Sequence, residues 1–137
     1  MTIKLNHFQH VGIPVTDINR SKEFYERLGF SNAMETVFDY EGAQGKVCMM
    51  KRGSMVFELY EFPEPAVSEI RGRKDGHMDH IAFDVDSVAE SFEWLKANGF
   101  QPLEEKPVEL KFWDKGCKFC FIKGPDGERL EFCEIVK

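Results

Sequence analysis

The stretch His10–Phe30, HVGIPVTDINRSKEFYERLGF, recurs 70 residues later as His80–Phe100, HIAFDVDSVAESFEWLKANGF. The two stretches align without a gap and share the first histidine, a valine, a serine, a glutamate and the closing Gly-Phe pair. Similarity at a fixed period is the signature of a repeated structural unit, and it decides the architecture before any other signal. We therefore predict a single domain, 1–137, made of two repeats at about 5–62 and 77–136.

A second similarity closes each half of the chain. The segment Met55–Tyr60 (MVFELY) aligns with Glu128–Cys133 (ERLEFC), so that Glu58 lies opposite Glu131. Each half therefore opens on a histidine in one predicted strand and closes on a glutamate in another. The result is a symmetric set of two imidazoles and two carboxylates.

The bulk composition is that of an ordinary globular protein. The chain is 42% hydrophobic and 31% charged, and no apolar run approaches the roughly 20 residues of a membrane helix. The first residues, MTIKLNHF, lack the apolar stretch of a signal peptide, so we expect a cytoplasmic protein with reduced cysteines. A net charge of −6 argues against a nucleic-acid partner, and no membrane partner is expected.

Apolar alternation predicts that each histidine lies on a strand, opposite the face that packs under a helix. Val11, Ile13 and Val15 share one face of the first strand, and His10 lies on the other. His80 has the same position relative to the aliphatic side of HIAFDV. Both imidazoles should therefore point away from the helices.

A helix is predicted directly after each of these strands. Asp17 is the expected N-cap of a helix over Ile18–Leu28, and Ser87 with Glu90 forms a capping-box pattern at the start of the second helix. Each helix ends in Gly-Phe, where glycine suits a left-handed residue. Three strands follow each helix, predicted at Ala33–Tyr40, Lys46–Arg52, Met55–Glu61, Gln101–Phe112, Cys117–Lys123 and Glu128–Val136. The predicted fold class is α+β, with two βαβββ modules.

The candidate functional site combines the two histidines with the two glutamates. Glu58 and Glu131 interrupt otherwise apolar strands, and a carboxylate there is costly to bury unless it is paired or bound to a metal ion. With His10 and His80 they form a nitrogen and oxygen set that suits Ni²⁺, Zn²⁺, Co²⁺, Fe²⁺ or Mn²⁺. Any one of the four alone is more often an ordinary polar residue, so the hypothesis depends on their recurrence in both repeats.

The βαβββ repeat, the H-[VI]-x-[IF]-x-V strand before each helix, the glutamate-bearing strands and the GPDG turn resemble the glyoxalase, bleomycin-resistance and extradiol-dioxygenase (vicinal oxygen chelate) superfamily, most closely glyoxalase I. The resemblance covers essentially the whole chain. It implies that the modules form a curved mixed sheet around a metal cavity, with His10, Glu58, His80 and Glu131 as ligands. It also implies a homodimer, in which each site is built from one chain or from two.

The resemblance further implies a metal-dependent lyase or isomerase of the lactoylglutathione lyase type. Such an enzyme moves a proton next to a carbonyl of a small oxygenated substrate or its thiol adduct; the ion would stabilise an enediolate, and Glu58 or Glu131 would be the base. Alternatives in the same superfamily are an epimerase, a thiol transferase, a non-catalytic small-molecule binding or resistance protein, and an extradiol-type dioxygenase that uses His10, His80 and one carboxylate on Fe²⁺.

Two positions depart from bacterial glyoxalase I. The arginine and the asparagine that help to hold glutathione in that enzyme are replaced by Pro14 and Phe62. We therefore expect the metal chemistry to act on a substrate other than the glutathione hemithioacetal.

Other reactive residues receive mainly structural interpretations. Cys117 and Cys120 form a CxxC, but a spacing of three sends them to opposite faces of a strand, so buried thiols are favoured over a zinc or redox pair. Cys133 is expected to share the face of Glu131, and Cys48 is expected in the core. The aromatic residues expected to line an apolar pocket or to pack in the core are Phe112, Trp113, Phe119 and Phe121.

The basic run Arg71–Lys74 lies in the polar junction between the repeats. It is interpreted either as a solvated connection or as a flap that meets an anionic substrate. His7 and His77 have no counterpart in the other repeat, and both are expected in loops or on the surface.

Overall fold

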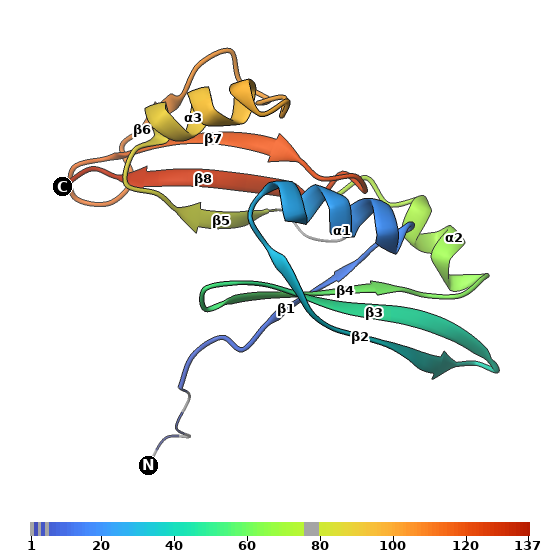
Figure 1. Ribbon diagram of the computed structural model, residues 1–137. Helices are drawn as coiled ribbons and strands as arrows, with labels where there is room; N and C mark the ends of the chain where they lie inside the picture. The colour runs from blue at the N-terminus through green and yellow to red at the C-terminus, as the bar shows by residue number, and fades with distance from the viewer. Residues whose placement is uncertain (1, 3, 5, 76–79) are drawn as a thin grey trace. The chain divides into compact units, whose positions relative to one another are not determined.

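The computed structural model describes residues 2, 4, 6–75 and 80–137 (Figure 1). The chain divides into two compact units, residues 1–76 and 77–137. Each unit contains a four-stranded mixed sheet whose first strand leads into a helix, so the predicted α+β class and the βαβββ modules are confirmed. No helix among the described residues is long and apolar enough to cross a membrane.

The first unit has the strand order β1-β4-β3-β2. Its first and last strands are parallel, and the other two pairs are antiparallel. A short helix, absent from the sequence prediction, follows the last strand. The elements are β1 (Val11–Pro14), α1 (Ile18–Arg27), β2 (Ser31–Tyr40), β3 (Ala43–Arg52), β4 (Met55–Glu61) and α2 (Ala66–Arg71).

The second unit repeats this topology with the order β5-β8-β7-β6. Again the first and last strands are parallel and the others antiparallel. The elements are β5 (Ile81–Asp84), α3 (Val88–Ala97), β6 (Val108–Leu110), β7 (Cys117–Lys123) and β8 (Arg129–Ile135).

The predicted strand Gln101–Phe112 is wrong over most of its length, because β6 is only three residues long. Pro102 and Pro107 have no N–H to donate to a strand ladder. At this edge of the sheet the carboxylate of Glu104 accepts a hydrogen bond from the Phe121 N–H, at 2.8 and 3.0 Å from its two oxygens. A side chain thus satisfies a backbone donor that a longer edge strand would have paired.

Both predicted N-caps are confirmed. The Asp17 carboxylate accepts from the Arg20 N–H at 3.1 Å, and the Ser87 hydroxyl accepts from the Glu90 N–H at 3.2 Å. These bonds satisfy donors that a helix start leaves without an intrahelical partner.

A second acceptor at each helix start comes from the last strand of the same unit. Glu61 Oε2 lies 2.7 Å from the Ile18 nitrogen, and Glu134 Oε2 lies 2.9 Å from the Val88 nitrogen. Each carboxylate faces the positive end of the helix dipole, where a negative charge stabilises the helix start. Each unit thus has a carboxylate clamp, in which Glu61 or Glu134 links the end of the last strand to the start of the helix.

Each helix covers one face of its sheet and leaves the other face uncovered by its own unit. In the first unit the Tyr25 ring packs edge-on against Phe30 and Phe57, with centroids 5.9 and 5.4 Å apart. Phe57 and Leu59 are buried on this face of β4. In the second unit Leu130 of β8 is buried on the corresponding face.

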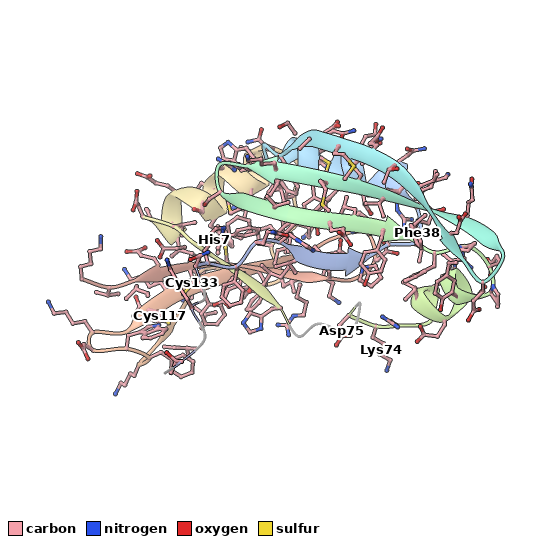
Figure 2. The ribbon with its side chains drawn as sticks, turned by 90° about the horizontal axis from the view of Figure 1, so that it is seen from below. His7, Phe38, Lys74, Asp75, Cys117 and Cys133 are labelled. Atoms are coloured by element: carbon pink, nitrogen blue, oxygen red, sulfur yellow. The ribbon has the colours of Figure 1, made fainter. Side chains whose placement is uncertain are left out.

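All four cysteines are free thiols, and Cys48, Cys117 and Cys120 are buried. Cys117 and Cys133 lie on the neighbouring strands β7 and β8 (Figure 2). Burial raises the pKa of Cys120 to about 12. Burial, followed by the nearby Cys117 and Glu131, raises the pKa of Cys133 to about 11. A protonated thiol is a poor nucleophile and a poor metal ligand, which favours a structural role for Cys120 of the CxxC.

The matched serines of the two helices differ in hydrogen bonding, which leads to a first prediction. Ser91 Oγ donates to the Ser87 carbonyl at 2.9 Å, whereas the fully buried Ser21 Oγ has no partner among the described residues. Alanine gains helix propensity at both positions, but only Ser91→Ala loses a hydrogen bond. We expect Ser21→Ala to raise the free energy of unfolding and Ser91→Ala to lie about 1 kcal/mol below it in denaturant titrations. Equal values for the two variants would contradict this assignment.

The raised thiol pKa values lead to a second prediction. Unfolded thiols ionise near 9.0, whereas folded Cys133 and Cys120 hold their protons until about pH 11 and 12. Protons are then bound more tightly by the folded chain, so their contribution to stability is complete below pH 9 and is lost as the pH rises toward 12. We expect Cys120→Ala to flatten this part of the pH–stability curve. Native thiols should also react with iodoacetamide at pH 8 far more slowly than unfolded ones; equal rates would refute their burial.

Candidate metal centre

The first half of the candidate site is a histidine–glutamate pair on the open face of the first sheet. Parallel pairing of β1 with β4 sets Gly12 beside Glu58. His10 lies two residues before Gly12, so its side chain shares that face. Its Nε2 atom is 3.6 Å from Glu58 Oε2, and the two side chains are 36% and 29% exposed. The His10 nitrogen and the Glu58 oxygen are therefore both accessible to a bound ion or small molecule.

The second half is the same pair in the second unit. Parallel pairing of β5 with β8 sets Ala82 beside Glu131, which is the register found in the first unit. His80 Nε2 lies 3.0 Å from Glu131 Oε2, and the two side chains are 39% and 14% exposed. The edge of the His80 ring packs against Phe121, with centroids 5.5 Å apart.

The predicted quartet is thus present as two pairs, one in each unit. Among the residues that the structure describes, no group of three or more His, Cys, Asp or Glu side chains is placed to hold a metal ion. Each unit alone supplies one imidazole nitrogen and one carboxylate, which is half of the four-ligand set inferred from the sequence.

The spacing within each pair fits two ligands of one divalent ion. Bonds of about 2.1 Å to nitrogen and oxygen separate neighbouring donors by about 3.0 Å at a right angle and about 3.4 Å at a tetrahedral angle. The observed separations of 3.0 and 3.6 Å lie close to these two values. These distances are compatible with two ligands of one divalent ion in each unit.

Small residues flank both carboxylates. Gly12 and Ala82 are the register partners of Glu58 and Glu131 on the adjacent parallel strands. A Cβ atom at Gly12 would lie 3.3 Å from the Tyr60 ring. The position two residues after each histidine therefore keeps space beside the carboxylate, a signal that the aligned strands contain but the sequence analysis did not use.

The other charged and aromatic candidates lie differently from expectation. Arg71 pairs with Glu64 at 3.6 Å and Arg73 with Glu69 at 2.7 Å, so these two arginines have partners within the first unit. His7 is exposed, as expected, and His77 lies outside the described residues.

Of the four aromatic residues expected in a pocket or in the core, two lie outside the core. Phe112 and Trp113 are 60% and 70% exposed around the turn between β6 and β7. Phe121 is buried and packs against Phe119, with ring centroids 5.5 Å apart. The core interpretation thus holds for Phe121 and is wrong for Phe112 and Trp113.

Sequence reasoning missed Glu61 and Glu134, which fix the helix starts three residues beyond Glu58 and Glu131. Both occur at the same offset in the two repeats, so the repeat alignment contained the signal. A charged residue near the end of a strand otherwise predicts only solvent exposure.

Relatives of known sequence share nearly the whole length of the chain. The uncharacterized protein YwkD of Bacillus subtilis (strain 168) is 32% identical over 133 residues, covering 95% of this chain and 98% of the relative. The uncharacterized protein YwbC of the same strain is 27% identical over 128 residues, covering 90% and 93%.

Solved structures and one protein family are also similar to this chain. A glyoxalase family protein from Enterococcus faecalis superposes with a TM-score of 0.72 at 26% identity, over 93% of this chain and 97% of its own. A glyoxalase I mutant from Zea mays shares the fold, with a TM-score of 0.66 at 19% identity over 94% of this chain and 44% of its own. Residues 9–121 match the family described as the Glyoxalase/Bleomycin resistance protein/Dioxygenase superfamily. The chain therefore belongs to this superfamily.

Proposed function

We propose that the protein is a metal-dependent lyase or isomerase, similar to glyoxalase I, that moves a proton next to a carbonyl of a small oxygenated substrate. His10, Glu58, His80 and Glu131 would hold one divalent ion. The observation that carries the proposal is the histidine–glutamate pair that occurs in both units in the same register, with donor separations of 3.6 and 3.0 Å. The open faces of the two sheets would meet around this ion, within one chain or across a homodimer.

The donor set fits a borderline divalent cation such as Ni²⁺, Zn²⁺, Co²⁺, Fe²⁺ or Mn²⁺. Such an ion, when bound, polarises a carbonyl and stabilises negative charge on adjacent oxygens. The superfamily description names glyoxalases and dioxygenases together, so the match to residues 9–121 leaves the reaction open. Two carboxylates among the ligands favour proton transfer, because a carboxylate can both bind the ion and accept a proton.

The chain's own part in the reaction follows from its carboxylates. The substrate would bind with two neighbouring oxygens toward the quartet, and Glu58 or Glu131 would take the proton from the adjacent carbon and return it to the next. The two groups differ in exposure, 29% for Glu58 and 14% for Glu131. Their different surroundings could assign one carboxylate to each face of the substrate.

The metal assignment predicts a specific pattern of affinity loss. Changes outside the first coordination shell already cost about 10- to 100-fold in metal affinity, so His10→Gln, Glu58→Gln, His80→Gln and Glu131→Gln should each weaken Ni²⁺ binding at least about tenfold in calorimetric titrations. His7→Gln and Glu109→Gln change exposed residues of the same types and should bind as the parent does. A quartet variant with undiminished affinity would remove that residue from the site.

The proton-transfer assignment makes a separate prediction. The metal-loaded protein should exchange deuterium from solvent into the carbon beside the carbonyl of methylglyoxal–thiol adducts or small hydroxyketones, followed by NMR. Removing a general base typically costs about 10²- to 10⁴-fold, so Glu58→Gln or Glu131→Gln should slow exchange by that order while the circular dichroism spectrum is retained. Exchange at the parent rate in both variants would rule out the mechanism.

A further inference from the structure

The open face of the first sheet carries a cluster of four aromatic rings, here called the aromatic wall: Phe38, Tyr40, Tyr60 and Phe62. Phe62 lies at its centre. Its ring centroid is 5.5 Å from Phe38, 4.8 Å from Tyr40 and 5.1 Å from Tyr60. Phe38 projects from the sheet near the end of β4 (Figure 2). The four residues come from β2 and from the end of β4, so only the folded sheet brings them together.

The aromatic wall differs from the rings on the other face of the same sheet. Beneath α1, Phe30 and Phe57 stack with centroids 5.0 Å apart and are 5% and 3% exposed. All four wall residues keep an intermediate exposure. The covered rings belong to the core, whereas the wall retains apolar surface that a ligand can cover.

The wall begins beside the candidate metal ligand. Glu58, Tyr60 and Phe62 alternate along β4 and its end, so they share one face of the sheet. At a rise of about 3.3 Å per residue, Tyr60 lies roughly 7 Å and Phe62 roughly 13 Å from Glu58 along the strand. A substrate held by its oxygens near Glu58 would place a ring or a short chain against Tyr60, and a longer group against Phe62.

A glycine on β3 lets the wall form. Gly45 is the register partner of Phe38, and an added Cβ there would overlap the Phe38 ring. It would also lie 2.7 Å from the Glu61 carbonyl oxygen. The Phe38 ring can thus pass over Gly45 and reach Phe62, the residue that follows β4.

Arg73, a cationic residue near the wall, is paired with a carboxylate. Its guanidinium lies near Tyr60 and donates two hydrogen bonds to the Glu69 carboxylate, at 3.1 and 2.7 Å. With the Arg73 charge matched and the rings dominant, the wall suits an uncharged apolar group better than a carboxylate-bearing arm.

We propose that the aromatic wall binds the apolar, uncharged part of the substrate, so that the substrate is a vicinal oxygen compound carrying an aromatic ring or a branched hydrocarbon group. The inference rests on the proposed metal centre and specifies its substrate class. The second unit has Cys133 and Ile135 at the positions that match Tyr60 and Phe62 by repeat offset. The matched quartet would therefore hold the reacting oxygens, and the wall would decide which way the rest of the substrate points.

Hydroxamates test this directly, because each presents two adjacent oxygens to a metal ion and differs only in its side group. Binding to the Ni²⁺-loaded protein would be measured by calorimetry for acetohydroxamate, benzohydroxamate, 3-phenylpropionohydroxamate and succinic monohydroxamate. Burying a phenyl ring should make the two aromatic compounds bind at least about tenfold more tightly than acetohydroxamate. The anionic succinic compound should gain nothing. In NMR spectra of the Zn²⁺-loaded protein, whose ion is diamagnetic, protons of the bound phenyl groups should shift upfield because they lie against aromatic rings.

Variants then locate the effect. Phe62→Ala and Tyr60→Leu should reduce the ratio of benzohydroxamate to acetohydroxamate affinity severalfold, and Phe112→Ala should leave that ratio unchanged because Phe112 is exposed on the other unit. Tight acetohydroxamate binding without any aromatic preference, or a preference that survives both wall variants, would overturn this inference alone. Failure of every hydroxamate to bind would overturn the metal centre and the inference together. The upfield shifts in the parent protein need no variant, so a misfolded variant does not remove the test.

Discussion

The site depends on the parallel pairing of the first and last strands of each unit. β1 with β4 and β5 with β8 use one register, which sets Gly12 beside Glu58 and Ala82 beside Glu131. Side chains alternate between the faces of a strand, so a slip of one residue would turn each carboxylate toward the helix. An unpaired carboxylate in that core would cost several kcal/mol. The buried residues beneath the helices therefore hold the register, and the register holds the candidate ligands on the open face.

The duplicated carboxylate clamp connects this register to the helices. Glu61 and Glu134 lie three residues beyond the candidate ligands and bind the first helical N–H groups at 2.7 and 2.9 Å. The spacing of three sends each clamp to the opposite face from Glu58 or Glu131, toward the helix. The end of each strand thus carries one carboxylate that binds the helix start and one that is a candidate metal ligand, and the alternation of side chains places them on opposite faces.

Much of the fold followed from local pattern and repetition. The 3.6-residue and two-residue periods identified α1, α3 and most strands, and β7 was predicted to the residue, because these segments have a covered apolar face and clear turns at their ends. The prediction failed at Gln101–Phe112, where apolar residues are scattered among prolines, and at α2, whose six residues are too few to show a period. Both segments are shaped by tertiary contacts, such as the bond from the Phe121 N–H to Glu104, that no local pattern contains.

The candidate ligands could be predicted from the sequence, whereas the aromatic wall could not. His10, Glu58, His80 and Glu131 recur at a fixed offset, so repetition alone singled them out. The wall occurs in one repeat only, and its members Phe38 and Phe62 become neighbours through the pairing of three strands. If the two repeats bind one ion together, each repeat has to supply donor atoms of the kind that this ion accepts. The ligand positions of the two repeats are therefore expected to carry the same residue types. Positions that do not bind the ion are free to differ between the repeats. The first repeat has Tyr60 and Phe62 where the second has Cys133 and Ile135. We therefore expect the residues that select the substrate to be ones that differ between the repeats. Repetition does not identify such residues, and the pairing of the strands has to be known before they can be recognised as neighbours.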